Sequence, residues 1–111
     1  MLYALLIFAA AALGGLYLAI RHFTGKSLPL PVALIHGAAG AAGIIALGMG
    51  LAAGGELARI SLVLFIVAAL GGFVLFSFHL RGKPLPSLVV VIHALVAVSA
   101  FVILAILVAR A

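Results

Sequence analysis

The sequence predicts an all-α integral membrane protein, a four-helix bundle built from two tandem helical hairpins of the same topology. Two observations carry this prediction. The chain of 111 residues is 69% apolar and only 6% charged, and one of its segments recurs further along the sequence. So little polar surface cannot cover an exterior that faces water. The bilayer must therefore act as the solvent.

Four apolar runs supply the predicted helices, because about 20 helical residues cross a hydrocarbon core. We expect one membrane domain over residues 1–111, with a first hairpin at 1–53 and a second at 57–111. The first run has no basic leader and corresponds to the third, so we expect it to be retained rather than cleaved. The runs are Leu2 to Ile20, Val32 to Ala53, Leu57 to Phe78 and Leu88 to Ala109.

An internal repeat relates the two hairpins. GGLYLAIRHFTGKSLPLPVALIH, from Gly14 to His36, aligns with GGFVLFSFHLRGKPLPSLVVVIH, from Gly71 to His93, and 11 of the 23 positions are identical. A hairpin crosses the membrane an even number of times, so both copies share one topology about a pseudo-two-fold axis along the membrane normal. All four histidines of the chain belong to the repeat, as the pairs His22 with His79 and His36 with His93.

The charged residues predict the orientation. Four basic residues lie in the first and third connections, and the opposite side has two basic residues and one acid. The positive-inside rule then places the basic turns in the cytoplasm and both termini outside, in a bacterial inner membrane. A net charge of +5 split between short turns favours anionic headgroups or an anionic cofactor over nucleic acid. The residues are Arg21, Lys26, Arg81 and Lys83 on one side, and Arg59, Arg110 and Glu56 on the other.

Turn signals predict the depth of the histidines. Gly25 and Gly82 are placed as helix C-caps, and Pro29 and Pro86 suit the entry into the next helix. This puts one histidine of each hairpin within about one turn of a helix end and the other one to two turns in. We therefore expect all four to form a rough layer near the basic side.

The chain has no cysteine, so it can form no disulfide, no thiolate metal site and no covalent haem attachment. We therefore expect histidine to be the residue that binds any ligand. Ionisable groups inside a membrane cost several kcal/mol unless they have a partner. A haem b would provide one, because imidazole is a good axial ligand. We favour His36 and His93 as its axial ligands. The residues expected near the propionates are His22, His79, Lys26, Lys83, Arg21 and Arg81.

Other ligand sets stay open at this stage. Two haems could share the four histidines, or all four could form a tetrahedral zinc or copper site. The chain could also hold no cofactor and serve as a structural or anchor subunit of a larger membrane complex. Other redox subunits or a second copy of the chain are further expected partners, beside the lipid bilayer. An electron-transfer or anchor subunit is favoured over a stand-alone enzyme.

Small residues precede the outer histidines and follow the inner ones at helical spacing. Such residues let membrane helices approach closely, as Gly50 and Gly54 would in a GxxxG motif on one helix, but they also leave room for a flat cofactor. We expect the second use beneath the histidines. The positions are Gly15 and Gly72, seven residues before His22 and His79, then Gly40 and Gly43 after His36, and Ala97 and Ala100 after His93.

With four helices and the paired histidines His22/His79 and His36/His93, the chain resembles the four-helix b-type membrane cytochromes. These include the bacterial cytochrome b561 group and the cytochrome b anchors of respiratory dehydrogenases. The resemblance covers the whole chain at the level of architecture. Those families place haems on both sides of the membrane, whereas here every histidine lies on one side. The resemblance therefore implies electron exchange with quinone at the cytoplasmic face, or an anchor role.

Overall fold

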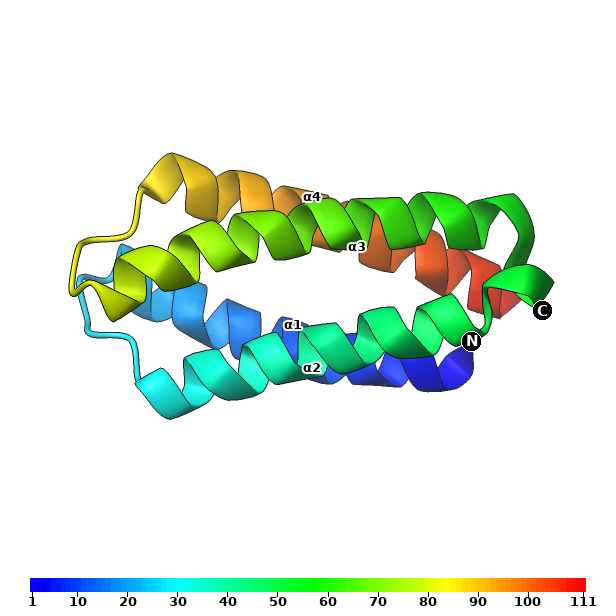
Figure 1. Cartoon of the computed structure of the whole chain (residues 1–111), viewed down its shortest axis with the longest axis horizontal. Helices are drawn as coiled ribbons and strands as arrows, with labels where there is room; N and C mark the ends of the chain where they lie inside the picture. The colour runs from blue at the N-terminus through cyan, green and yellow to red at the C-terminus, as the bar shows by residue number, and fades with distance from the viewer.

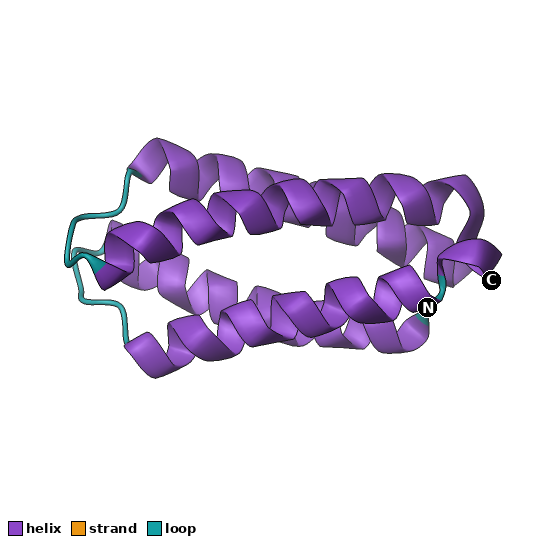
Figure 2. Ribbon diagram, in the orientation of Figure 1, coloured by secondary structure: helices purple, strands orange, loops and turns teal.

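The computed structural model describes all 111 residues, as an antiparallel bundle of four α-helices without any strand (Figures 1 and 2). Helices α1 and α2 form one hairpin and α3 and α4 the other. Between the hairpins, α2 contacts α3 and α1 contacts α4, so α1/α3 and α2/α4 are the diagonal pairs. This confirms the predicted all-α fold. The helices are α1 (Leu2–Phe23), α2 (Leu30–Met49), α3 (Leu51–Leu80) and α4 (Ser87–Arg110).

The dimensions and the outer surface suit a bilayer. Each helix is long and apolar enough to cross a membrane. The bundle measures 42 × 22 × 20 Å, and a bilayer is about 40–45 Å thick with its headgroups. Only 12 residues are buried, and large apolar side chains such as Tyr3, Phe73 and Leu88 point outward. Lipid would cover this apolar exterior.

Both basic turns lie at one end of the bundle, and the two chain termini lie at the other (Figure 1). Each turn begins with a glycine in the left-handed region, Gly25 with φ 72° and Gly82 with φ 65°. The N–H groups of Lys26 and Lys83 reach back to carbonyls five residues earlier, which is the Schellman arrangement. Pro29 and Pro86 follow as the N-caps of α2 and α4. The predicted turns are confirmed.

The connection between the hairpins differs from the prediction. Helix α2 ends at Met49 and not at Ala53, and Gly50 caps it. One helical turn follows, and Gly55, with φ 65° and ψ −150°, interrupts α3. Gly50 and Gly54 therefore do not form a GxxxG motif on one helix. Apolar residues continue through this region, so hydropathy hides a break that glycine's backbone freedom permits.

The buried core repeats in layers about the bundle axis. All of the twelve buried residues except Ala58 and Val90 form pairs at equivalent positions of the two hairpins. In one layer the rings of Phe8 and Phe65 stack with centroids 3.6 Å apart and planes within 2°. The other paired layers are Ala4/Ser61, Ala11/Ala68, Gly43/Ala100 and Leu47/Leu104.

The packing is uneven along the axis. The continuous apolar core includes the stacked phenylalanines and lies toward the chain termini. From the phenylalanines to the basic turns the buried residues are only Ala11, Ala68 and Val90. The repeated histidines of α2 and α4 lie in this half, which has fewer buried residues.

Candidate ligand site between the hairpins

His36 and His93 meet inside the bundle, on the diagonal helices α2 and α4. Their ring centroids are 6.2 Å apart, and the ring planes are inclined by 87°. Each is the seventh residue of its helix, which places it about 10 Å from the basic end at 1.5 Å per residue. Each hairpin thus contributes one equivalent imidazole to the same site.

Hydrogen bonds determine which nitrogen of each ring carries the proton. Nδ1 of His36 lies 2.8 Å from the carbonyl oxygen of Ala11, and Nδ1 of His93 lies 2.7 Å from that of Ala68. A carbonyl can only accept, so each Nδ1–H is the donor, and the Nε2 of a neutral ring keeps its lone pair. Neither Nε2 forms a hydrogen bond within the protein. Metal-ligating histidines commonly have their second nitrogen held in this way.

Gly15 and Gly72, seven residues before His22 and His79 on the same helices, lie against the rings of His36 and His93. A Cβ at Gly15 would be 2.9 Å from Cε1 of His36, and one at Gly72 would be 3.2 Å from Cε1 of His93. In the structure the space at these two glycines is therefore taken by imidazole.

The four histidines do not form one layer. His22 shares a hydrogen bond with Ser87, Nε2 to Oγ 2.9 Å, at the start of α4. His93 lies six residues further along that helix, so it is about 9 Å deeper. His79 is on the outer level, beside the ring of Phe76. His36 and His93 lie beside Gly14 and Gly71 of the neighbouring antiparallel helices. His22 and His79 are eight residues further along those helices, near their ends, so the two pairs lie at different depths.

The structure therefore does not bring the four histidines together as a tetrahedral site requires. No three His, Asp or Glu side chains lie where they could hold one metal ion. The structure instead brings the pair His36 and His93 together. Metal–imidazole bonds are about 2 Å long and a ring nitrogen is about 1 Å from its ring centre, so one metal ion bound by a nitrogen of each ring allows the ring centres to be up to roughly 6 Å apart. The ring centroids of His36 and His93 are 6.2 Å apart, at about this limit.

The basic residues lie near the outer level. Arg21 donates from Nε to the carbonyl of Ser27 across its turn. Arg81 lies over the ring of Phe78, 4.8 Å from its centroid, and donates to the carbonyl of Ser77. Lys26 and Lys83 are exposed in the turns. No acidic side chain lies at this end of the bundle, so its charge is positive throughout.

The small residues after the deep histidines have separate surroundings. A Cβ at Gly43 would meet the ring of Phe8 at 2.6 Å, whereas one at Gly40 would meet nothing within 4 Å. Ala100 is fully buried, and its carbonyl accepts a hydrogen bond from Ser61. Ala97 is half-buried. Gly43 and Ala100 thus serve helix packing in this structure.

Several residues of the site region were missed in the sequence. The carbonyls of Ala11 and Ala68 hold the imidazoles, and the rings of Phe8 and Phe65 close the apolar core below them. The signal was available, because the repeat offset continues upstream of Gly14 and Gly71 and pairs Phe8 with Phe65. Ser87 has no such signal, because its equivalent in the first hairpin is Leu30.

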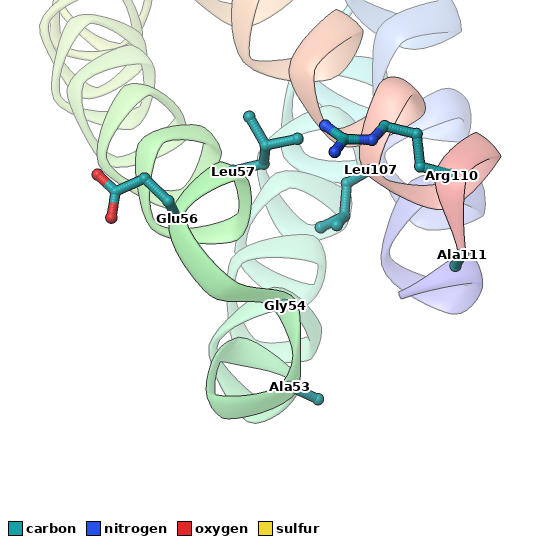
Figure 3. A pocket seen from close by; sticks show the side chains of 7 residues that line it. All are labelled: Ala53, Gly54, Glu56, Leu57, Leu107, Arg110 and Ala111. Carbon is teal, nitrogen blue, oxygen red and sulfur yellow. The ribbon is translucent and has the colours of Figure 1, made fainter.

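A cavity of about 550 Å³ opens at the other end of the bundle, beside the chain termini (Figure 3). The Arg110 side chain extends across it, while that of Glu56 points away. Glu56 instead lies near Arg59, with Oε2 and Nη1 3.8 Å apart. No histidine lines this cavity, so it is separate from the imidazole pair.

Comparisons with protein-family models, with curated proteins and with solved structures find no match to this chain. The site is therefore interpreted from its own geometry.

Proposed function

We propose that this protein is a b-type membrane cytochrome that binds one haem b and carries electrons within a membrane redox chain. His36 and His93 are the axial ligands in this proposal. The observation that carries it is the pair of imidazoles 6.2 Å apart, each with Nδ1 bonded to a backbone carbonyl and Nε2 free of hydrogen bonds.

The surroundings of the pair support haem over a bare metal ion. Two histidines alone leave a zinc or copper ion without its usual third and fourth ligands, whereas haem iron needs only two axial ligands. The site lies between two separate hairpins, in the half of the bundle that has fewer buried residues. Lys26, Lys83 and the two arginines at the basic end suit the two carboxylates of a haem.

One haem is proposed in preference to two. His22 is already hydrogen-bonded to Ser87, and no second imidazole ring lies against it or against His79. Haem would supply one-electron redox chemistry at this level of the membrane. The chain's own part is to hold the ring nitrogens in place and to exclude water with apolar helices.

We further propose that the basic turns face the cytoplasm of a bacterial cell and that the protein exchanges electrons with quinone there. The basic end carries four of the six lysine and arginine residues, as the positive-inside rule favours for a cytoplasmic face. Placing the imidazole pair about 10 Å from that end also favours exchange on that side. The four-helix architecture and the paired histidines are shared with the b-type cytochromes that the chain resembles.

Absorption spectroscopy of the purified protein tests the proposal. After reconstitution with haem b, we expect a Soret band and, with dithionite, a sharp α band typical of six-coordinate low-spin iron. His36→Ala and His93→Ala should each abolish the sharp α band. His22→Ala is the matched control, because it removes an imidazole of the outer level and should leave the spectrum unchanged.

The opposite pattern would assign the ligands to the outer histidines. A folded protein that takes up no haem would end the cytochrome proposal and favour a cofactor-free anchor subunit.

A further inference from the structure

We propose that Gly15 and Gly72 are positioning residues for His36 and His93. By having no side chain, each glycine opens a backbone carbonyl to the imidazole N–H, and this fixes which ring nitrogen is free. The proposal deepens the proposed function and rests on it only for the effect on bound haem. The placement of the proton in the free protein does not depend on haem.

Helix geometry explains why the glycine must be at this position. In an α-helix the carbonyl of residue i accepts from the N–H of residue i+4, and side chains tilt back toward the helix N-terminus. A side chain at i+4 therefore covers the carbonyl of residue i. Gly15 is four residues after Ala11, and Gly72 is four residues after Ala68. These are the two carbonyls that accept from the histidines.

The neighbouring glycines provide an internal contrast. A Cβ at Gly15 would lie 2.9 Å from Cε1 of His36, a distance at which the ring must move. At Gly72 the corresponding distance to Cε1 of His93 is 3.2 Å, which demands a smaller shift. A Cβ at Gly14 or Gly71 would instead be 3.5 or 3.6 Å from the histidine Cβ, an ordinary contact. The ring atom nearest to a Cβ at Gly14 or Gly71 is Nδ1, at 3.8 or 3.7 Å, so only the second glycine of each pair is in tight contact with the ring.

The apolar surroundings make this contact necessary. An imidazole N–H without a partner is costly away from water. Helix carbonyls in a membrane are already bonded within their helix, but a carbonyl oxygen has two lone pairs and can accept a second donor where nothing covers it. Gly15 and Gly72 expose one such oxygen to each histidine. Both Nδ1 atoms are thereby held as donors and both Nε2 atoms remain available to a ligand.

The first test uses the full chain without haem, labelled with ¹⁵N-histidine in lipid nanodiscs. Nitrogen chemical shifts report the protonated nitrogen of each ring, and His36→Ala and His93→Ala assign the signals. We expect wild type, Gly14→Ala and Gly71→Ala to keep His36 and His93 with the proton on Nδ1. Gly15→Ala should shift the proton of His36 to a mixture of both nitrogens and leave His93 unchanged. Gly72→Ala should do the same to His93, to a smaller extent.

A Gly15→Ala protein that keeps the proton of His36 on Nδ1 would overturn the proposal, as would an equal effect of Gly14→Ala. Circular dichroism in the same nanodiscs shows whether Gly15→Ala folds. If it does not fold, the nitrogen shifts of His93 in Gly72→Ala test the proposal instead, because the contact at Gly72 is looser and needs only a small shift of the ring.

The second test measures haem affinity and the reduction potential of the same variants. Loss of a partner that orients a metal ligand costs 10–100-fold in affinity, so we expect at least a tenfold weaker affinity for Gly15→Ala and a shifted potential. Gly14→Ala should match wild type. If no variant takes up haem but the nitrogen shifts follow the expected pattern, the cytochrome proposal fails and the glycine proposal holds. If haem is bound and Gly15→Ala matches Gly14→Ala in both tests, the glycine proposal fails and the cytochrome proposal holds.

Discussion

At the scale of single residues, hydrogen bonds distinguish the two histidines of the first hairpin by the ring nitrogen that each leaves free. His22 shares its Nε2 with Ser87, while His36 uses Nδ1 toward Ala11 and leaves Nε2 free. The repeat presents the two residues as similar candidates, since each is matched by a histidine in the second hairpin. Their difference arises from neighbours on other helices.

Gly43 should be sensitive to the addition of a single methyl group. A Cβ there would lie 2.6 Å from the Phe8 ring, which is itself stacked on Phe65 and cannot retreat freely. We expect Gly43→Ala to lower the free energy of unfolding by about 1–3 kcal/mol, as for other overpacked cores. Gly40→Ala, where the methyl group meets nothing within 4 Å, should stay within about 0.5 kcal/mol. Unfolding in mixed detergent micelles measures both, and equal losses would contradict the predicted contact.

Ser61 should contribute little despite being fully buried. Its hydroxyl donates to the carbonyl of Ala100 over 3.0 Å and joins α3 to α4. Hydrogen bonds between membrane helices average about 0.6 kcal/mol, so Ser61→Ala should lower the free energy of unfolding by roughly that amount. Ser99→Ala is the control, because Ser99 bonds within its own helix to Leu95. A loss above about 2 kcal/mol would show that this bond is stronger than membrane helices usually achieve.

At the scale of helices and turns, glycine ends or interrupts three of the four helices. Gly25 and Gly82 form equivalent turns at the basic end, after α1 and α3. At the other end Gly50 caps α2 and Gly55 breaks the start of α3. Gly25 and Gly82 were predicted because a proline follows each at a fixed spacing. Gly55 lies within a run of apolar and small residues without such a marker.

Gly55→Ala should destabilise the link between the hairpins. The backbone at Gly55, with φ 65° and ψ −150°, is in a region that only glycine occupies readily, and such strain costs about 1–3 kcal/mol. Gly48→Ala is the matched control, because Gly48 is helical and a Cβ there meets nothing within 4 Å. The free energy of unfolding in the same micelles compares the two. Equal stability of the variants would mean that the link can adopt another conformation.

At the scale of the whole molecule, the two hairpins combine to form the candidate site. Each hairpin holds its own histidine through its own carbonyl, Ala11 for His36 and Ala68 for His93. The spacing of the two rings depends on how the hairpins pack together, with Phe8 of one hairpin stacked on Phe65 of the other. A single hairpin would supply only one of the two proposed axial ligands.

The orientation of the bundle can be tested with single cysteines, since the chain has none of its own. We expect Lys26→Cys and Lys83→Cys to react with a membrane-impermeant maleimide only from the cytoplasmic side. Glu56→Cys, at the opposite end, should react only from outside. Labelling intact cells and inverted vesicles separates the two sides. Labelling of Lys26→Cys and Lys83→Cys from opposite sides would contradict the shared topology of the hairpins.

The number of helices, the basic turns and the equivalence of the hairpins follow from the sequence, because they depend on local composition and on spacing along one chain. Hydropathy determines the runs, glycine and proline mark the turns, and the repeat relates the halves. The choice of His36 and His93 as a pair was also available, since the repeat matches them and a pair across the bundle leaves room for a ligand.

The two levels of histidines, the role of Gly15 and Gly72, and the break at Gly55 emerged from the packed structure. The position of a residue in its helix predicts the direction of its side chain. It does not predict which residue of an antiparallel neighbouring helix lies beside that side chain. The answer depends on the axial position of α1 relative to α2. In this structure that position brings Gly15 close to the His36 ring. Spacing along the chain does not predict the contacts between helices. Those contacts determine that His36 forms its hydrogen bond through Nδ1 and leaves Nε2 free.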